Sequence, residues 1–216
     1  MLIIFDCDGV LVDSETLSSE VFSECLKHVG IEMPAAACFQ QFQGQSLVNC
    51  YRWIEDNFST PLPTDFNAFL ELKTLERFSD ELKPVAGVEK VLRYLSENEI
   101  DFCVASNGGH EKIKSALRTT GLLKYFNRRF SVDDVVHGKP APDVFLYAAK
   151  TMQKKIEDTW VVEDSEAGWL AANSAGMRVA VYAPHGEPKF PCENVVTSMG
   201  ELLRLLQCEY DKARES

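Results

Sequence analysis

Acidic side chains directly follow two short apolar runs of this sequence. Asp6 and Asp8 stand two residues apart after the first run, and Gly9 then allows the backbone to turn sharply. Glu163 and Asp164 are adjacent and follow a run much later in the chain. Hard oxygen ligands from separate segments, with positions left for water and substrate, are typical of Mg²⁺ sites in proteins. These four acids are therefore predicted to form one Mg²⁺ site.

Asp6 is predicted to be the reactive member of this group. A nearby cation favours the ionised form of an aspartate, so its carboxylate can attack phosphorus and form an aspartyl-phosphate. The metal ion would offset the repulsion between this carboxylate and the phosphate group. A second carboxyl group must protonate the leaving oxygen and later activate water, and Asp8 is close enough in sequence to do both.

Four apolar runs predict the strands that position these acids. They are Leu2–Phe5, Phe102–Ala105, Trp160–Val162 and Arg178–Tyr182. Runs of this kind are typical of strands buried on both faces of a parallel sheet. Helical patterns alternate with them, over Val88–Glu97, Lys112–Thr119, Val144–Met152 and Ala167–Ala175. The alternation predicts an α/β fold with a doubly wound, Rossmann-like parallel sheet, in which ligands bind at the carboxyl ends of the strands.

Residues 15–82 interrupt this alternation with helical patterns and no convincing strand. The patterns lie over Leu17–Val29, Leu47–Asn57 and Phe66–Phe78. Proline residues stand at the expected helix ends. We therefore expect a small α-helical domain of residues 15–82, inserted into an α/β core domain of residues 1–14 and 83–216.

Four segments resemble, in the expected order, the four motifs of the haloacid dehalogenase-like (HAD) hydrolase superfamily. They are Asp6–Ser14, Ser106–Gly108, Gly138–Asp143 and Val162–Gly168. The resemblance spans essentially the whole chain. It implies the β-phosphoglucomutase-like and CbbY-like phosphatase branch, in which the helical insertion is a cap that closes over the core and selects substrates. Closure of such a lid excludes bulk water until the site is assembled.

The resemblance implies a role for each of the four acids. Asp6 is the nucleophile and a Mg²⁺ ligand, and Asp8 is the general acid/base, which also offers its backbone carbonyl to the metal. Asp164 is a Mg²⁺ ligand, with Glu163 beside it directly or through water. An alternative without function is that Glu163 and Asp164 cap the helix expected to begin near Ala167, where carboxylates are electrostatically favoured.

The resemblance also implies a phosphate-binding group. Ser106, Asn107 and Gly108 follow the second predicted strand and would grip phosphate oxygens, and Lys139 would hold phosphate and nucleophile together. Ser106, Asn107 and Gly108 could instead only cap the helix that follows them. In isolation Lys139 would be an ordinary surface lysine, but its place among the ordered motifs favours the catalytic role.

The expected activity is hydrolysis of a small phosphorylated metabolite, such as a sugar phosphate or a sugar-acid phosphate. A dehalogenase of this superfamily lacks the second aspartate of the first motif, whereas Asp8 is present here. A catalytically idle binding protein should have lost at least one motif residue, and none is lost.

A hexose-phosphate mutase is the closest alternative. In β-phosphoglucomutases a cap segment that typically reads Lys-Gly-x-Ser-Arg holds the second phosphate group. The corresponding residues here, Gln43–Leu47, lack both basic side chains. Losing a charge-assisted contact weakens binding by about ten- to more than a hundredfold, which favours hydrolysis. Arg52, Lys73 or Arg77 could substitute for the missing charges.

The composition limits the expected partners. The chain has 22 basic and 33 acidic residues and a formal net charge of −11, which argues against nucleic acid and anionic membranes. An anionic substrate then needs a local cation, either a metal ion or one or two placed lysines. The seven cysteines are scattered, and the sequence shows no signal peptide or membrane span. We expect a cytoplasmic monomer.

Overall fold

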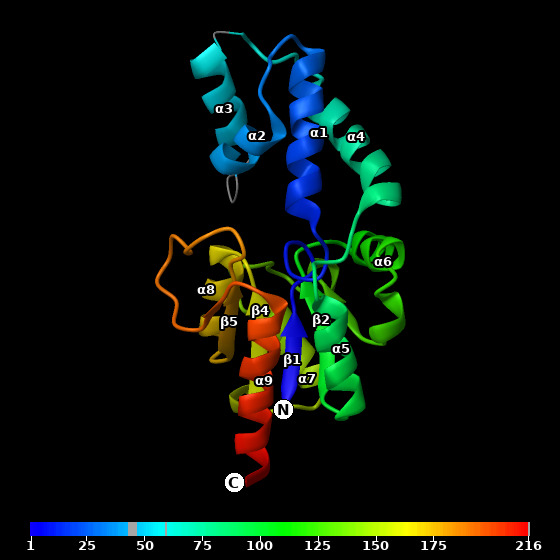
Figure 1. Ribbon diagram of the computed structural model, residues 1–216, viewed down its shortest axis with the longest axis vertical. Helices are drawn as coiled ribbons and strands as arrows, with labels where there is room; N and C mark the ends of the chain where they lie inside the picture. Colours follow the sequence, from blue (N-terminus) through cyan, green and yellow to red (C-terminus); the bar gives the residue numbers. More distant parts are fainter. Residues whose placement is uncertain (43–46, 59, 216) are drawn as a thin grey trace. The chain divides into compact units, whose positions relative to one another are not determined.

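The chain forms two compact units. The computed structural model describes residues 1–42, 47–58 and 60–215. The first unit, called here the α/β unit, comprises Met1–Val12 and Pro84–Ser216 (Figure 1). The second, called the helical unit, comprises Asp13–Lys83.

The described part of the α/β unit contains one parallel sheet with the strand order β3-β2-β1-β4-β5-β6. The strands are β1 (Leu2–Phe5), β2 (Asp101–Ser106), β3 (Arg129–Ser131), β4 (Thr159–Glu163), β5 (Arg178–Tyr182) and β6 (Val195–Val196). All four expected strands are confirmed. The chain proceeds outward from β1 through β2 to β3, then returns to the other side of β1, so the order reverses between β1 and β4. In open sheets, ligands bind outside the carboxyl ends of the strands at such a reversal.

Helices cover both faces of this sheet. They are α5 (Val88–Glu97), α6 (His110–Thr119), α7 (Asp143–Thr151), α8 (Glu166–Ser174) and α9 (Met199–Glu215). Apolar side chains of α7 and α8 pack on one face, against alternate strand residues such as Ile4 and Val161. On the other face Phe5 meets Phe102 edge to face, and α5 lies beside α9 (Figure 1). The expected doubly wound α/β fold is confirmed.

The helical unit contains four helices in its described part. They are α1 (Ser14–His28), α2 (Ala35–Phe42), α3 (Leu47–Phe58) and α4 (Phe66–Glu81). Its core is apolar and aromatic, with Phe22 of α1 packed against Phe42, Tyr51 and Phe66. The expected helices match α1, α3 and α4, whereas α2 was not expected. Within the described residues, we find no helix with the length and apolar character needed to span a bilayer.

Candidate active site

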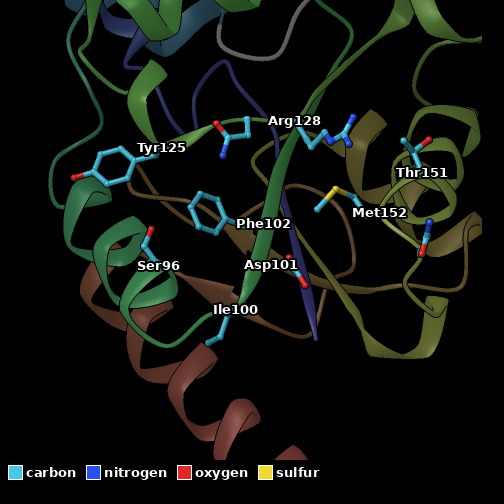
Figure 2. Close-up of a pocket in the computed structure, with 10 residues that line it drawn as sticks. Ser96, Ile100, Asp101, Phe102, Tyr125, Arg128, Thr151 and Met152 are labelled. Atoms are coloured by element: carbon cyan, nitrogen blue, oxygen red, sulfur yellow. The ribbon is translucent and has the colours of Figure 1, made fainter.

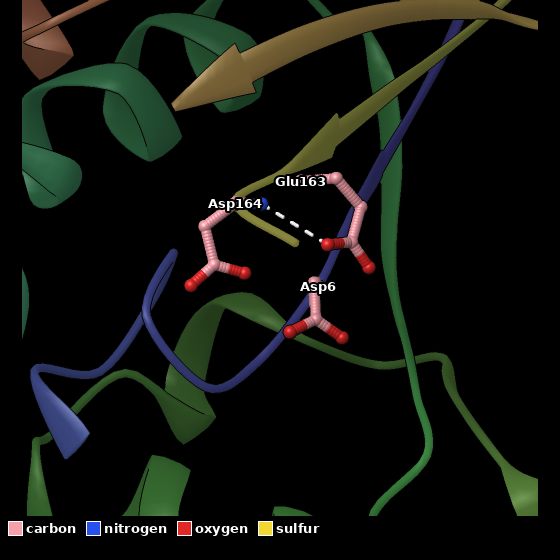
Figure 3. Close-up of side chains that lie close together, drawn as sticks. All are labelled: Asp6, Glu163 and Asp164. Carbon is pink, nitrogen blue, oxygen red and sulfur yellow. Dashed lines mark hydrogen bonds between the residues drawn. The ribbon is translucent and has the colours of Figure 1, made fainter. Parts of the chain in front are cut away.

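Three carboxylates meet where the strand order of the sheet reverses. Asp6 follows β1, while Glu163 ends β4 and Asp164 comes directly after it. One carboxylate oxygen from each of these residues lies within 4.8 Å of one oxygen of each of the other two (Figure 3). Asp6 and Glu163 are buried, and Asp164 is partly buried. The structure thus brings the three predicted acids together at the edge of the sheet where a ligand is expected.

Lys139 lies at the centre of this group. Its Nζ donates hydrogen bonds to Asp6 Oδ1 at 2.6 Å and to Glu163 Oε1 at 2.6 Å. A third bond goes to the carbonyl oxygen of Ala105 at 2.9 Å, and the ammonium also lies 4.7 Å from the centre of the Phe145 ring. All three N–H donors of the ammonium are therefore used within the protein. The lysine holds the predicted nucleophile in a fixed position.

Burial makes the charges of this group depend on one another. Burial raises the pKa of Asp6 from 3.8 to about 7, although the charge of Lys139 opposes this rise. Burial alone would lower the pKa of Lys139, but the carboxylates of Asp6 and Glu163 hold it well above its ordinary value. Lys139 is therefore a permanent cation, whereas an ionised Asp6 needs more positive charge than this lysine provides.

The acidic group fits a divalent cation. If all are ionised, Asp6, Glu163 and Asp164 carry three negative charges against the single positive charge of Lys139, a balance that one Mg²⁺ would neutralise. The donors are hard carboxylate oxygens, which Mg²⁺ prefers. Gly9 leaves the space that this arrangement needs: its φ is +74°, and a Cβ there would lie 1.9 Å from Asp164 Oδ2. Only glycine lets the loop after β1 approach Asp164 this closely.

Glu163 has a second task within the site. Its Oε2 accepts hydrogen bonds from the backbone N–H groups of Asp164, at 3.0 Å, and Ser165, at 3.1 Å, and from the Ser165 hydroxyl at 2.9 Å. Its other oxygen accepts from Lys139. A Cβ at Gly168 would overlap the Glu163 carboxyl group, so the first turn of α8 needs a glycine at this contact. Glu163 therefore orders the loop that presents Asp164.

The predicted phosphate-binding residues lie at the end of β2. Ser106 is the last residue of that strand and is buried, and its Oγ accepts a hydrogen bond from the Gly108 N–H at 3.1 Å. The hydroxyl proton of Ser106 is left to bind another acceptor. The contact of these residues with phosphate stays a prediction.

The side chain of Asn107 connects two loops of the site. Its Oδ1 accepts from the backbone N–H of Lys139 at 2.8 Å, and its Nδ2 donates to the Lys139 carbonyl at 3.1 Å. A Cβ at Gly138 would lie 2.8 Å from Asn107 Oδ1, so glycine is needed beside this pair of bonds. The asparagine amide thus fixes the backbone that carries the lysine. Sequence reasoning missed this role, because the two residues are 32 positions apart.

The alternative that these motifs only cap helices is wrong. The N-cap of α6 is Gly109, and the first N–H group of that helix, from His110, is accepted by Asp133 at 3.0 Å. The N-cap of α8 is Ser165, whose side chain accepts from the Gly168 N–H. Capping is therefore performed by neighbouring residues, and the motif side chains make the contacts described above.

Asp8 lies in the loop after β1, and its carboxylate is not among the three clustered acids. Its Oδ2 accepts from the ammonium of Lys112 at 2.6 Å, while its Oδ1 is buried without a hydrogen-bond partner in the described structure. Burial alone would lower the pKa of Lys112, but the charge of Asp8 and their hydrogen bond raise it. Sequence reasoning missed Lys112. A signal was present, because a cation in the first turn of a helix is electrostatically unfavourable and needs a partner.

A separate pocket of about 450 Å³ lies elsewhere in the α/β unit (Figure 2). Its lining includes Ile100, Asp101 and Phe102, at the amino end of β2, together with Arg128 and Met152. Parallel strands direct their amino and carboxyl ends to opposite edges of the sheet, so this pocket lies away from the clustered acids. The predicted catalytic residues contribute nothing to its lining.

Comparison with known proteins agrees with this geometry. Residues 1–176 match the model of the haloacid dehalogenase-like hydrolase family. The 6-phosphogluconate phosphatase of Escherichia coli is 30% identical over 190 residues, which cover 86% of this chain and 85% of that protein. The expected enzyme class, a phosphoric monoester hydrolase, is confirmed by the family and by such relatives.

Solved structures show the same fold over nearly the whole chain. A haloacid dehalogenase-like protein of unknown function from Agrobacterium tumefaciens is 31% identical, with a TM-score of 0.84, covering 97% of this chain and 98% of that one. A β-phosphoglucomutase-like protein of Thermotoga maritima is 25% identical, with a TM-score of 0.79, covering 95% of this chain and 98% of that one. These likenesses fit the expected branch. From its motifs, its sheet and its relatives, the chain belongs to the haloacid dehalogenase-like hydrolase family.

Proposed function

We propose that this protein is a Mg²⁺-dependent phosphatase that hydrolyses a small phosphorylated metabolite through an aspartyl-phosphate on Asp6. The observation that carries the proposal is the buried contact of Lys139 with Asp6 and Glu163, beside Asp164 and at the reversal of the strand order. Burying opposite charges together carries a considerable desolvation cost. Buried charged groups of this kind are typical of catalytic sites.

Asp6 and Asp164 would hold the Mg²⁺ ion, with the backbone carbonyl of Asp8 and with Glu163 directly or through water. When bound, the ion supplies positive charge that keeps Asp6 ionised and offsets the charge of the transferred phosphoryl group. Lys139 orients the Asp6 carboxylate and shares one of its oxygens. When substrate enters, one of the three lysine donors would turn to a phosphate oxygen, and the Ser106 hydroxyl would donate to another.

Asp8 would carry the protons of both steps. In the first step an Asp6 oxygen attacks phosphorus, the bond from phosphorus to the ester oxygen breaks, and Asp8 gives its proton to that oxygen. In the second step Asp8 takes a proton from water as the water oxygen attacks phosphorus. The bond from phosphorus to Asp6 then breaks, which releases inorganic phosphate and restores both aspartates.

A sugar phosphate or sugar-acid phosphate is the proposed substrate class. The support is the relationship to the Escherichia coli 6-phosphogluconate phosphatase. The formal charge of −11 is consistent with a small substrate held by local cations, and it disfavours nucleic acid. We further propose that the helical unit acts as the cap, and that the protein works as a monomer in the cytoplasm.

Hydrolysis is preferred to the mutase reaction. Residues 43–46, which lack the basic side chains of the mutase motif, lie outside the described residues. Two of the cations that could replace those charges are already paired within the helical unit: Lys73 with Glu76, and Arg77 with glutamates of α1 and α4. If Lys73 or Arg77 bound a second phosphate group, its ion pairs with these glutamates would have to break.

The test is phosphate release from a panel of sugar phosphates, sugar-acid phosphates, nucleotides and short alkyl phosphates, with Mg²⁺ and with EDTA. The panel includes β-glucose 1-phosphate, whose isomerisation is followed separately. Metal-dependent release concentrated on a few compounds is expected. Isomerisation without net release would instead establish a mutase, and no reaction with any compound would favour a catalytically idle protein.

A further inference from the structure

Lys112 occupies a position where a lysine is electrostatically disfavoured. It is the third residue of α6, and the N-terminal turn of a helix carries partial positive charge from its unpaired N–H groups. Acidic residues are favoured there, and Glu111 beside it follows that rule. A cation at this position therefore needs a compensating contact. The side chain is about half exposed, at 52%, so packing in the core does not explain its presence.

The side chain of Lys112 reaches across the predicted phosphate-binding loop to Asp8. A Cβ at Gly108 would lie 3.3 Å from Lys112 Cδ, which shows how closely the lysine stem passes that glycine. The ammonium then donates to Asp8 Oδ2 at 2.6 Å, joining residues that are 104 positions apart. Asp8 lies in the loop after β1, and Lys112 lies in the first turn of α6, the helix after β2. The contact therefore connects the loop after β1 with the helix after the neighbouring strand β2.

The two oxygens of Asp8 are in different situations. Oδ2 is fixed by Lys112, whereas Oδ1 is shielded from solvent and has no hydrogen-bond partner in the described part of the chain. A buried carboxylate oxygen without a partner is costly, and proteins keep such atoms mainly where a ligand or reacting group completes the contact. Fixing one oxygen leaves the other as the atom that can exchange a proton with substrate.

We propose that Lys112 is a positioning residue that orients the Asp8 carboxyl group for proton transfer to the leaving oxygen of the substrate. The inference rests on the proposed phosphatase function. Its chemistry balances within the two steps described above, because the proton given to the leaving oxygen returns to Asp8 from the attacking water. Lys112 itself exchanges no proton and acts only through the geometry of Asp8.

The test compares two kinds of phosphate ester. One is the alkyl phosphate that the wild-type protein hydrolyses fastest in the panel, whose leaving oxygen must be protonated. The other is 2,4-dinitrophenyl phosphate, whose leaving group departs as a stable anion. The ratio kcat/KM is measured for both, because it reports the first step, in which Asp8 acts as the acid. A lysine with only a structural role would affect both esters alike.

Lys112→Met is expected to lower kcat/KM for the alkyl ester by about 10- to 100-fold, part of the usual contribution of a general acid, and for 2,4-dinitrophenyl phosphate by less than about threefold. In an Asp8→Asn background the same substitution should add almost nothing, because its effect passes through Asp8. Lys114→Met is the matched control, since Lys114 is an exposed lysine of the same helix, paired loosely with Glu111.

Three outcomes would overturn the inference. The first is that Lys112→Met lowers kcat/KM equally for the two esters, and the second is that it lowers kcat/KM for neither. The third is that the reductions in kcat/KM caused by Lys112→Met and by Asp8→Asn multiply in the double variant. In each case the wild-type protein is active, so the phosphatase proposal survives. A wild-type protein that hydrolyses no ester with Mg²⁺ would instead overturn the proposed function, and this inference with it.

Discussion

The two units of the chain differ in what they bury. Among the described residues, the buried charged side chains are Asp6, Lys139 and Glu163, and all belong to the α/β unit. The helical unit buries apolar, aromatic and cysteine side chains, while the ion pairs of Arg77 there involve glutamates that are about half exposed. Burying charge destabilises a fold unless it is compensated. The difference indicates that the α/β unit retains buried charge for chemistry, whereas the helical unit is built for packing.

Asp6→Asn is expected to have the largest effect on activity. An amide cannot serve as the nucleophile, so kcat should fall by at least about 10⁴-fold, while the folded structure persists. Phosphate release with Mg²⁺ measures the loss, and circular dichroism checks the fold. Asp101→Asn is the control, because Asp101 is an exposed carboxylate of the same unit, paired with Lys154. Substantial Mg²⁺-dependent turnover by the Asp6 variant would exclude this residue as the nucleophile.

Lys139→Met should have the largest effect on stability. It leaves Asp6 and Glu163 buried without their partner, which costs about 3–5 kcal/mol in the free energy of unfolding. Arg77→Met in the helical unit should cost about 1 kcal/mol or less, because its glutamate partners are about half exposed to water. Urea unfolding measures both values. Equal costs would show that the two units do not differ in the way described above.

Mg²⁺ is expected to stabilise the wild-type protein. A ligand bound only by the folded state, at about one hundred times its dissociation constant, adds about 2.7 kcal/mol to the free energy of unfolding. Thermal unfolding with Mg²⁺ and with EDTA measures this gain, and EDTA should also abolish phosphate release. Asp164→Asn should remove most of the stabilisation, whereas Asp80→Asn in the helical unit should leave it intact. A gain that survives in the Asp164 variant would contradict the metal assignment.

Packing changes in the helical unit should have the smallest effects. Ile54 is fully buried, so Ile54→Val is expected to cost about 0.5–1.5 kcal/mol. Leu75 is 71% exposed, and Leu75→Ala should change stability by less than about 0.5 kcal/mol. Neither should alter the stabilisation by Mg²⁺. Loss of that stabilisation in the Ile54 variant would show that this core does more than hold its own helices together.

The sequence predicts the sheet well because its strands are buried on both faces. Continuous apolar runs located β1 and β5 at their observed bounds, whereas β3 and β6 have three and two residues and are too short for a pattern to emerge. Helix α2 has only eight residues and follows Pro34. Helix α9 was not predicted either, although its sequence carries a helical signal: the buried residues Leu202 and Leu206 lie one turn apart.

The predicted acids of the active site could be found because they follow strands directly. Two contacts were not predicted, namely that of the Asn107 amide with the Lys139 backbone and that of Lys112 with Asp8. For Lys112 the sequence indicates that the cation needs a partner but not which residue supplies it. Each contact joins residues far apart in sequence through side-chain direction, which periodicity does not encode. Asn107 illustrates the limit: its type and place predict phosphate binding, which stays a prediction, but they do not reveal the bonds of its amide with the Lys139 backbone.

The central place of β1 in the sheet has a consequence for how the protein folds. Both of its neighbours come much later in the chain: Leu2 pairs with Asp101 on one side and with Thr159 on the other. During synthesis the first strand therefore emerges long before either neighbour, and its apolar side chains stay exposed to solvent until those neighbours are made. Such non-local pairing slows folding and exposes intermediates to aggregation. Asp6, the proposed nucleophile, belongs to a segment made early that reaches its final surroundings only after β4 has formed.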